Sequence, residues 1–305
     1  MTVLAPLLVL AMAPVAAGLI GGRVATRAAR RLPPAAATVA LTGFALTVSF
    51  ATLALLCLTA FLGVVERFPA THPSDWSTPT LRERLPVPIP VGLAAGGVAA
   101  ALLGRAARHL GRAVATARRT AAVVATWPSV GELTIVDDNA AHAYSVPGRN
   151  RRVVVSTGLL RSLTGPQRRA LLAHEQAHLR HHHHRYAQLA RLAAAAHPTL
   201  SPVARAVDRA IERWADAVAV RAVGDPVTVA HALGVAALAA PPPAGGLGAA
   251  HHDVVDRVRD LLEPPRRRSR AAVPLALAAL LCWASVIALA LYTFSVVELS
   301  ESTLG

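Results

Sequence analysis

Apolar residues gather in four long blocks along the chain instead of alternating with polar ones. The blocks cover residues 3–20, 35–65, 87–103 and 271–297. A helix of about 20 apolar residues crosses the ~30 Å hydrocarbon layer of a bilayer. The pattern therefore predicts four transmembrane helices, the third of them short and rich in Gly and Ala. The first block is not a secretory signal, because no basic residue precedes it and Arg23 follows it.

Residues 105–270 lie between the third and fourth blocks and carry mixed strand and helix patterns. Short strands are expected at residues 133–136, 143–146 and 152–156, and later helices near 227–239 and 251–262, with a Pro- and Gly-rich loop at 241–246. A segment of this length suffices for one domain. The fold class predicted is an α-helical membrane protein with four transmembrane helices and an α+β domain containing a small sheet.

The charge pattern predicts the orientation of these spans. All 31 basic residues are arginine, and they crowd after the first and third blocks and before the fourth. By the positive-inside rule these clusters are cytoplasmic. We therefore expect a multi-pass protein of a bacterial-type cell membrane, its N-terminus outside, residues 66–86 as an outer loop, 105–270 in the cytoplasm and 298–305 as a short outer tail.

A net charge of +14 and a pI of about 11.5 also raise the possibility of nucleic-acid binding. Much of the excess charge lies beside the spans, where each arginine gains about 1 kcal/mol from anionic lipid. The chain has no recognisable DNA-reading motif. We therefore expect membrane lipids as partners and no direct binding of nucleic acid. Cys57 and Cys282 lie inside the predicted spans and are expected to be small packing residues.

Residues 174–178 form a His-Glu-x-x-His motif. On a helix, His174 and His178 lie one turn apart on the same face and can bind one zinc ion. Glu175 then lies at the open side of the metal, where it can act as the general base toward water. Thr164-Gly165-Pro166-Gln167 reads as a capping box, which predicts a helix starting near Pro166 and carrying the motif about two turns in.

A second helical stretch begins near Ser201 and contains Glu212 and Asp216, one turn apart. An oxygen ligand and a carboxylate that orients a ligating imidazole would complete a catalytic zinc site. The alternative is a solvated helix face on which these carboxylates pair with Arg209 or Arg213.

The histidines that follow the motif allow two further interpretations. In the pattern with a third histidine, His184 would be that ligand, but His181 stands where the pattern has glycine. We therefore expect the helix to continue and carry His184 away from the metal. The run from His181 to His184 allows two interpretations, a polar helix end, which we favour, and a second metal site.

Several segments together resemble the integral-membrane gluzincin peptidases: residues 143–148, the apolar run 153–155, residues 157–160, the His-Glu-x-x-His helix and the Glu-x-x-x-Asp helix. Within that group the chain is most similar to the BlaR/MecR antirepressor peptidases, with HtpX and Ste24 as more distant relatives. The resemblance implies a gluzincin-like zinc metalloprotease domain with zinc on His174, His178 and Glu212, Glu175 as base and Asp216 behind the ligands. It also implies a substrate-facing edge strand that includes Tyr144, Ser145 and Val146.

Two classes of function follow. The first is an active zinc endopeptidase whose protein substrate is a winged-helix transcriptional repressor in a BlaR-like protein, or damaged membrane proteins in an HtpX-like one. The second is a non-catalytic zinc-binding sensor or scaffold, which would not need Glu175. The chain has no lysine, so it lacks the Ser-x-x-Lys nucleophile of a penicillin sensor. His181, Tyr186 and His231 are candidates for contacting the oxyanion or the substrate.

Overall fold

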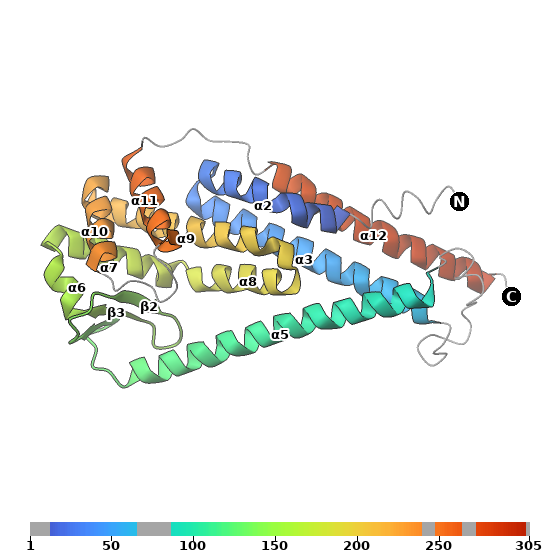
Figure 1. Ribbon diagram of the computed structural model, residues 1–305, viewed down its shortest axis with the longest axis horizontal. Coiled ribbons are helices and arrows are strands. Elements are labelled where there is room, and N and C mark those ends of the chain that lie inside the picture. Colours follow the sequence, from blue (N-terminus) through green and yellow to red (C-terminus); the bar gives the residue numbers. More distant parts are fainter. Residues whose placement is uncertain (1–12, 66–86, 240–247, 264–272, 303–305) are drawn as a thin grey trace.

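The computed structural model describes residues 13–65, 87–239, 248–263 and 273–302. Figure 1 shows an elongated molecule. A small sheet lies near one end with α6 (Thr157–Ser162), α7 (Gly165–Arg180), α10 (Pro226–Ala239) and α11 (Gly248–Leu262). Long helices make up the rest of the molecule: α5 (Ile89–Ala125) extends from the sheet to the other end, and α3 (Pro34–Val64) and α12 (Val273–Ser302) also run toward that end.

Three described helices are long and apolar enough to cross a membrane: Pro34–Val64, Ile89–Ala125 and the Val273–Ser295 part of α12. They correspond to the second, third and fourth predicted spans. The third is the first part of a continuous 37-residue helix. Of the first predicted span, residues 3–12 lie outside the described part of the chain, and the remainder opens α2 (Ala13–Arg31). The outer loop 66–86 and the loop 241–246 also lie outside it.

Prolines and small residues explain how these helices begin and cross. Pro33 and Pro88 immediately precede α3 and α5, where a missing N–H costs no helical hydrogen bond. Gly63 and Gly92 bring the two helices together, because a Cβ on Gly63 would lie 2.5 Å from the Cα of Gly92. Cys282 is buried as expected, whereas Cys57 is exposed on α3 and does not fill a packing site.

The three predicted strands form one mixed sheet. β1 (Leu133–Val136) pairs parallel with β3 (Arg152–Ser156), which pairs antiparallel with β2 (Ala143–Val146). The strand order is β1-β3-β2, so β2 lies at an edge of the sheet, and it contacts α7. Val153 and Val155 of β3 pack against α7 and α10, which anchors the sheet to the helix that carries the motif.

Helix α9 (Ser201–Val223) connects the two ends of the molecule. Its first half packs with α2, α3, α8 (His183–Ala196) and α12 in one apolar cluster that includes Leu41, Leu200 and Val207. Its second half packs against α7 and α10 through Ala219. Gly224, in the left-handed conformation at φ 82°, ends the helix. Glu212 and Asp216 thus lie where α9 passes from one core to the other.

Candidate metal centre

The capping box at residues 164–167 places the motif on α7. The Thr164 N–H donates to the side-chain oxygen of Gln167 at 2.9 Å, and the helix begins at Gly165, next to the predicted start. His174 and His178 then lie on the same face of the helix. Their Nε2 atoms are 3.2 Å apart, so both imidazoles point toward one position.

Glu212 reaches the same position from α9. Its carboxylate oxygens lie 3.5 Å from His174 Nε2 and 3.7 Å from His178 Nε2. Two nitrogens bound at roughly 2.0–2.1 Å in a tetrahedral site would be about 3.3 Å apart. The three ligand atoms, which all lie within 4.8 Å of one another, therefore have nearly the spacing that zinc requires. Two imidazoles and one carboxylate are also a donor set suited to catalytic zinc.

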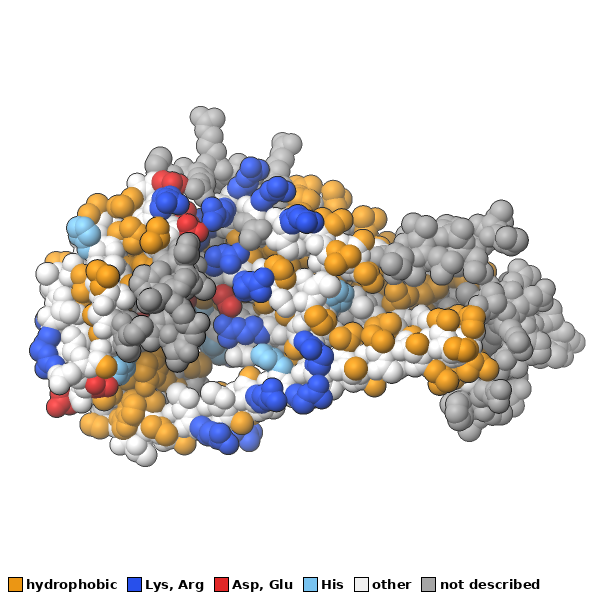
Figure 2. Space-filling model, in the orientation of Figure 1, with side chains coloured by type: hydrophobic (Ala, Val, Ile, Leu, Met, Phe, Trp, Pro, Cys, Tyr) orange, Lys and Arg blue, Asp and Glu red, His pale blue; other side chains and the backbone are white. Residues whose placement is uncertain are grey.

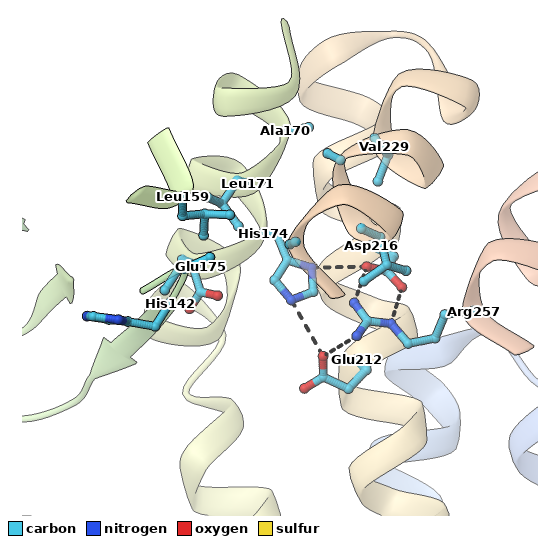
Figure 3. A pocket seen from close by; sticks show the side chains of 15 residues that line it. His142, Leu159, Ala170, Leu171, His174, Glu175, Glu212, Asp216, Val229 and Arg257 are labelled. Carbon is cyan, nitrogen blue, oxygen red and sulfur yellow. Dashed lines mark hydrogen bonds and ion pairs between the residues drawn. The ribbon is translucent and has the colours of Figure 1, made fainter. Parts of the chain in front are cut away.

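Asp216 stands behind His174 and is almost completely buried, with 4% of its surface exposed. His174 Nδ1 lies 3.0 Å from one Asp216 oxygen, a contact that fixes the ring with Nε2 toward Glu212. The Asp216 carboxylate also accepts two hydrogen bonds from Arg257 of α11, at 2.7 and 2.9 Å. Arg257 makes a further ion pair with Glu212 at 3.1 Å (Figure 3). The solvated-face interpretation is wrong, since Arg213 pairs with Asp260 instead.

These contacts separate the pKa values of the two histidines. Burial lowers the pKa of His174, but its hydrogen bonds to Asp216 and Glu212 outweigh burial and raise it to about 9. Burial lowers the pKa of His178 to about 4. Burial raises the pKa of Glu212, yet His174 and Arg257 hold it well below its usual range. Without metal, the site is thus a protonated His174 beside an ionised Glu212 and a neutral His178.

Glu175 projects toward the opposite side of the site from Asp216 (Figure 3). Burial raises the pKa of its carboxyl, against the lowering effect of the His174 charge. The nearby side chain of Ser145 on β2 also lowers the pKa of this carboxyl. A carboxylate with a raised pKa beside a metal position is suited to accept and return a proton near neutral pH.

Two cavities adjoin the ligand cluster. One, of about 460 Å³, is lined by His174, Glu175 and Arg257 and by apolar side chains that include Leu159, Leu171, Val229 and Leu233. The other, of about 250 Å³, is more polar and is lined by Ser145, His178, His184, Arg191 and Asp208. Glu212 borders both, so the ligand cluster lies between an apolar and a polar hollow.

The edge strand β2 borders both cavities as well. Ala143 lines the apolar cavity and Ser145 the polar one. Tyr144 and Val146, on the alternate face, pack with Val124 and Trp127 at the end of α5. Of the three predicted strand residues, Ser145 therefore lies at the site and the other two pack on the sheet's opposite side.

The prediction that the motif helix continues through His184 is wrong. Helix α7 ends at Arg180, and His182 adopts a left-handed conformation with φ 53°. The chain turns there, and a new helix begins at His183. Packing on both sides of the turn compensates for the unfavourable backbone conformation of His182. His181 stacks on Trp214 with ring centroids 4.8 Å apart, and the side chain of His183 is buried, with 1% of its surface exposed.

The turn brings His183 next to the ligand cluster. Its Nδ1 lies 3.2 Å from Nδ1 of His178, and its ring also contacts Trp214 at 4.8 Å. Burial lowers the pKa of His183 to about 3, so this imidazole is neutral. His183 thus contacts the ring nitrogen of His178 that faces away from Glu212, as Asp216 does for His174.

The other histidines and Tyr186 take different places. His184 lines the polar cavity. His181 stacks on Trp214, Tyr186 packs against the apolar cluster around α9, and His231 is exposed on α10. Among the described residues, the only group of three or more His, Cys, Asp or Glu placed to hold a metal is His174, His178 and Glu212.

Comparison with known families agrees with this geometry. Residues 110–197 match the model of Peptidase family M48. The match covers the sheet and the helix with both histidines, and it ends before Glu212. No curated protein and no solved structure matches the chain. The match supports a metallopeptidase of family M48, whose members are typically zinc-dependent.

Sequence analysis missed two residues of this site, His183 and Arg257. Both contact the predicted groups directly, at 3.2 Å and 2.7 Å. His183 was hidden in a run of four histidines, and the turn that separates it from its neighbours has no glycine to mark it. Arg257 is one of 31 arginines and follows Asp216 by 41 residues, so no local pattern distinguishes it.

Proposed function

We propose that this protein is a membrane-embedded zinc endopeptidase that cleaves a cytoplasmic transcriptional repressor, as a regulatory peptidase of the BlaR type. The observation that carries the catalytic part is Glu175, a carboxylate with a raised pKa beside two histidines and a glutamate spaced for zinc. A scaffold that only bound the metal would need the three ligands but not a fourth, unligated carboxylate at the open side.

His174, His178 and Glu212 would hold the ion, and Asp216 and Arg257 would keep His174 and Glu212 in place. When bound, Zn²⁺ supplies Lewis acidity that activates water and polarises the scissile carbonyl. Glu175 accepts the proton from the attacking water and returns it to the leaving amine. Ser145 lowers the pKa of the Glu175 carboxyl and so favours the ionised form that accepts this proton.

The edge position of β2 supports an extended protein substrate. A peptide strand can add to a free sheet edge through backbone hydrogen bonds, so that its side chains enter hollows on either side. β2 borders both cavities, and the ligand cluster lies between them. A substrate strand along β2 would thus present one peptide bond to Glu175.

The choice of a cytoplasmic repressor rests on the arginine clusters and the sequence resemblance. Arginines after the first and third apolar blocks and before the fourth favour a cytoplasmic position for residues 105–270. A winged-helix repressor would be accessible there.

Glu175→Gln tests the proposal, because it keeps the side-chain shape and all three ligands but removes the base. Purified wild-type and variant protein should bind near-stoichiometric zinc, while the variant loses cleavage of a candidate winged-helix repressor. Glu132→Gln, which removes an exposed carboxylate paired with Arg151, is the matched control and should cleave normally.

Undiminished cleavage by Glu175→Gln would refute the mechanism. In cells, an intact repressor in both strains with misfolded membrane proteins accumulating only in the Glu175→Gln strain would instead assign the protein to membrane-protein quality control. Zinc binding with no cleavage of either substrate would leave the sensor or scaffold hypothesis.

A further inference from the structure

A third, small cavity lies where the C-terminal end of α2 meets α9 and α11. Its volume is about 40 Å³. At about 10–15 Å³ for each water, that is room for roughly three waters. Ala29 contributes to its wall, and the other lining side chains are two aspartates and five arginines: Arg30, Arg209, Arg213, Arg257 and Arg259. The cavity therefore has an excess of positive charge.

Arg257 is paired with Asp216 and Glu212, which lie outside this cavity. The two lining aspartates do not neutralise the other four arginines. Asp256 is shared between Arg30 at 2.9 Å and Arg259 at 3.5 Å. Asp260 pairs with Arg213 at 3.0 Å. Arg209, by contrast, forms no hydrogen bond or ion pair with any residue in the described ranges. A half-buried guanidinium thus lines a positively charged cavity with its donors unused.

The frame of the cavity is held together from several elements. Arg213, next to Glu212 on α9, also donates a hydrogen bond to the carbonyl of Ala29 in the last turn of α2. The same side chain pairs with Asp260 of α11, so it joins three helices. Arg257 lines both this cavity and the apolar cavity at the ligand cluster. Arg213 and Arg257 are therefore held by partners on neighbouring helices, whereas the side chains of Arg30 and Arg259 are largely exposed at the rim.

The position of the cavity along the molecule favours a ligand found at a membrane surface. Arg30 lies four residues before Pro34, where the first described membrane-length helix begins. Figure 2 shows arginine side chains gathered across the middle of this face, between the sheet-bearing end and the apolar surface of the long helices. Basic pockets between helices at this depth attract anionic lipid headgroups.

We propose that this cavity binds a phosphate group, with Arg209 and Arg213 as its principal contacts. A guanidinium presents planar paired donors that match two phosphate oxygens. The volume admits one tetrahedral anion and excludes a sugar or a base, so the rest of any larger ligand lies outside. The phosphate belongs either to an anionic lipid or to free inorganic phosphate. This binding does not depend on proteolysis.

The experiment uses full-length, zinc-loaded protein in neutral detergent. Native mass spectrometry measures retention of phosphatidic acid and of phosphatidylcholine, and isothermal calorimetry measures binding of inorganic phosphate. Arg209→Gln should weaken binding about tenfold, the effect of losing one charge-assisted contact. Arg205→Gln is the matched control, because Arg205 lies one turn earlier on α9, is exposed and does not line the cavity. It should bind as the wild type does.

The outcomes distinguish a lipid headgroup from free inorganic phosphate, and both from binding by surface charge alone. Retention of phosphatidic acid without binding of inorganic phosphate identifies a lipid headgroup, whereas tight binding of inorganic phosphate identifies the free anion. Equal losses in Arg205→Gln and Arg209→Gln would overturn the proposal, since surface charge alone would then explain binding. Unchanged binding in Arg209→Gln would overturn it as well. If Arg209→Gln fails to fold, Arg209→Lys replaces it and should show a smaller loss, because its point charge forms one contact where a guanidinium forms two.

Discussion

Zinc binding should be coupled to the release of a proton from His174. In the metal-free site the pKa of His174 is about 9, because Asp216 and Glu212 outweigh the effect of burial. A protonated imidazole cannot bind zinc, so the metal competes with that proton at every pH below about 9. At pH 7 the two pH units between pH and pKa correspond to roughly 2.7 kcal/mol, or about 100-fold in affinity. Zinc affinity should therefore rise with pH until about pH 9 and then level off.

The proton count distinguishes this site from one with ordinary histidines. His178, with a pKa of about 4, is already neutral and contributes no proton. His174 should release about one proton at both pH 6 and pH 7.5, while a zinc-bound water with a pKa of roughly 7 adds more at the higher pH. The total should thus rise with pH. Two ordinary histidines would release about 1.5 protons at pH 6 and only about 0.2 at pH 7.5, so their total with the water would fall.

Isothermal calorimetry of zinc binding to metal-stripped protein, in two buffers of different ionisation enthalpy, gives the number of protons released. Asp216→Asn should reduce this number at pH 7.5, because the neutral amide no longer stabilises the imidazolium. A total that falls between pH 6 and pH 7.5 in the wild-type protein would refute the reasoning.

Three further predictions concern the ligands, the histidine turn and the topology. Glu212→Ala should lower zinc content sharply in metal analysis while His184→Ala leaves it nearly unchanged; the reverse result would favour the pattern with a third histidine. His183→Ala should lower zinc affinity or kcat by about 10 to 100-fold, the usual cost of losing a group that orients a metal ligand. His183→Asn should restore part of the lost affinity or activity. Full activity in His183→Ala would mean that His178 needs no such support. Reporter fusions at residue 75 and after Gly305 should read as outside and those near 115 and 245 as cytoplasmic, and an outside signal at 245 would exclude a cytoplasmic substrate.

The local parts of the fold could be predicted from the sequence because their causes are local. A capping box determines where α7 begins, and the spacing of His174 and His178 places both imidazoles on one face. The three strands have the bounds expected from β-branched runs between turn residues. The second, third and fourth apolar blocks correspond to described helices for the same reason, since length and composition alone decide whether a segment can span a bilayer.

The parts that were missed depend on contacts between distant segments. The turn at His182 forms because rings on either side of it pack against Trp214, which lies 32 residues further along the chain. Arg257 reaches Asp216 only because α11 packs beside α9 and α10. Sequence reasoning predicted the cluster of candidate metal ligands and Asp216 behind it. It did not predict His183 or Arg257, since any of many histidines and arginines could have served.

Helix α5 joins the proposed substrate strand to the apolar end of the molecule as a single unbroken element. Its last turn is fixed to the sheet by Arg152, which donates hydrogen bonds to the carbonyls of Val124 and Trp127 at 3.1 and 2.8 Å. At 1.5 Å per residue, 37 residues make a rod about 55 Å long, so a tilt of about 5° at one end moves the other by roughly 5 Å. That displacement is about the spacing between neighbouring β-strands. If the first part of α5 spans a bilayer and a substrate strand lies along β2, as proposed above, bilayer thickness and peptide alignment would be mechanically linked through this one helix.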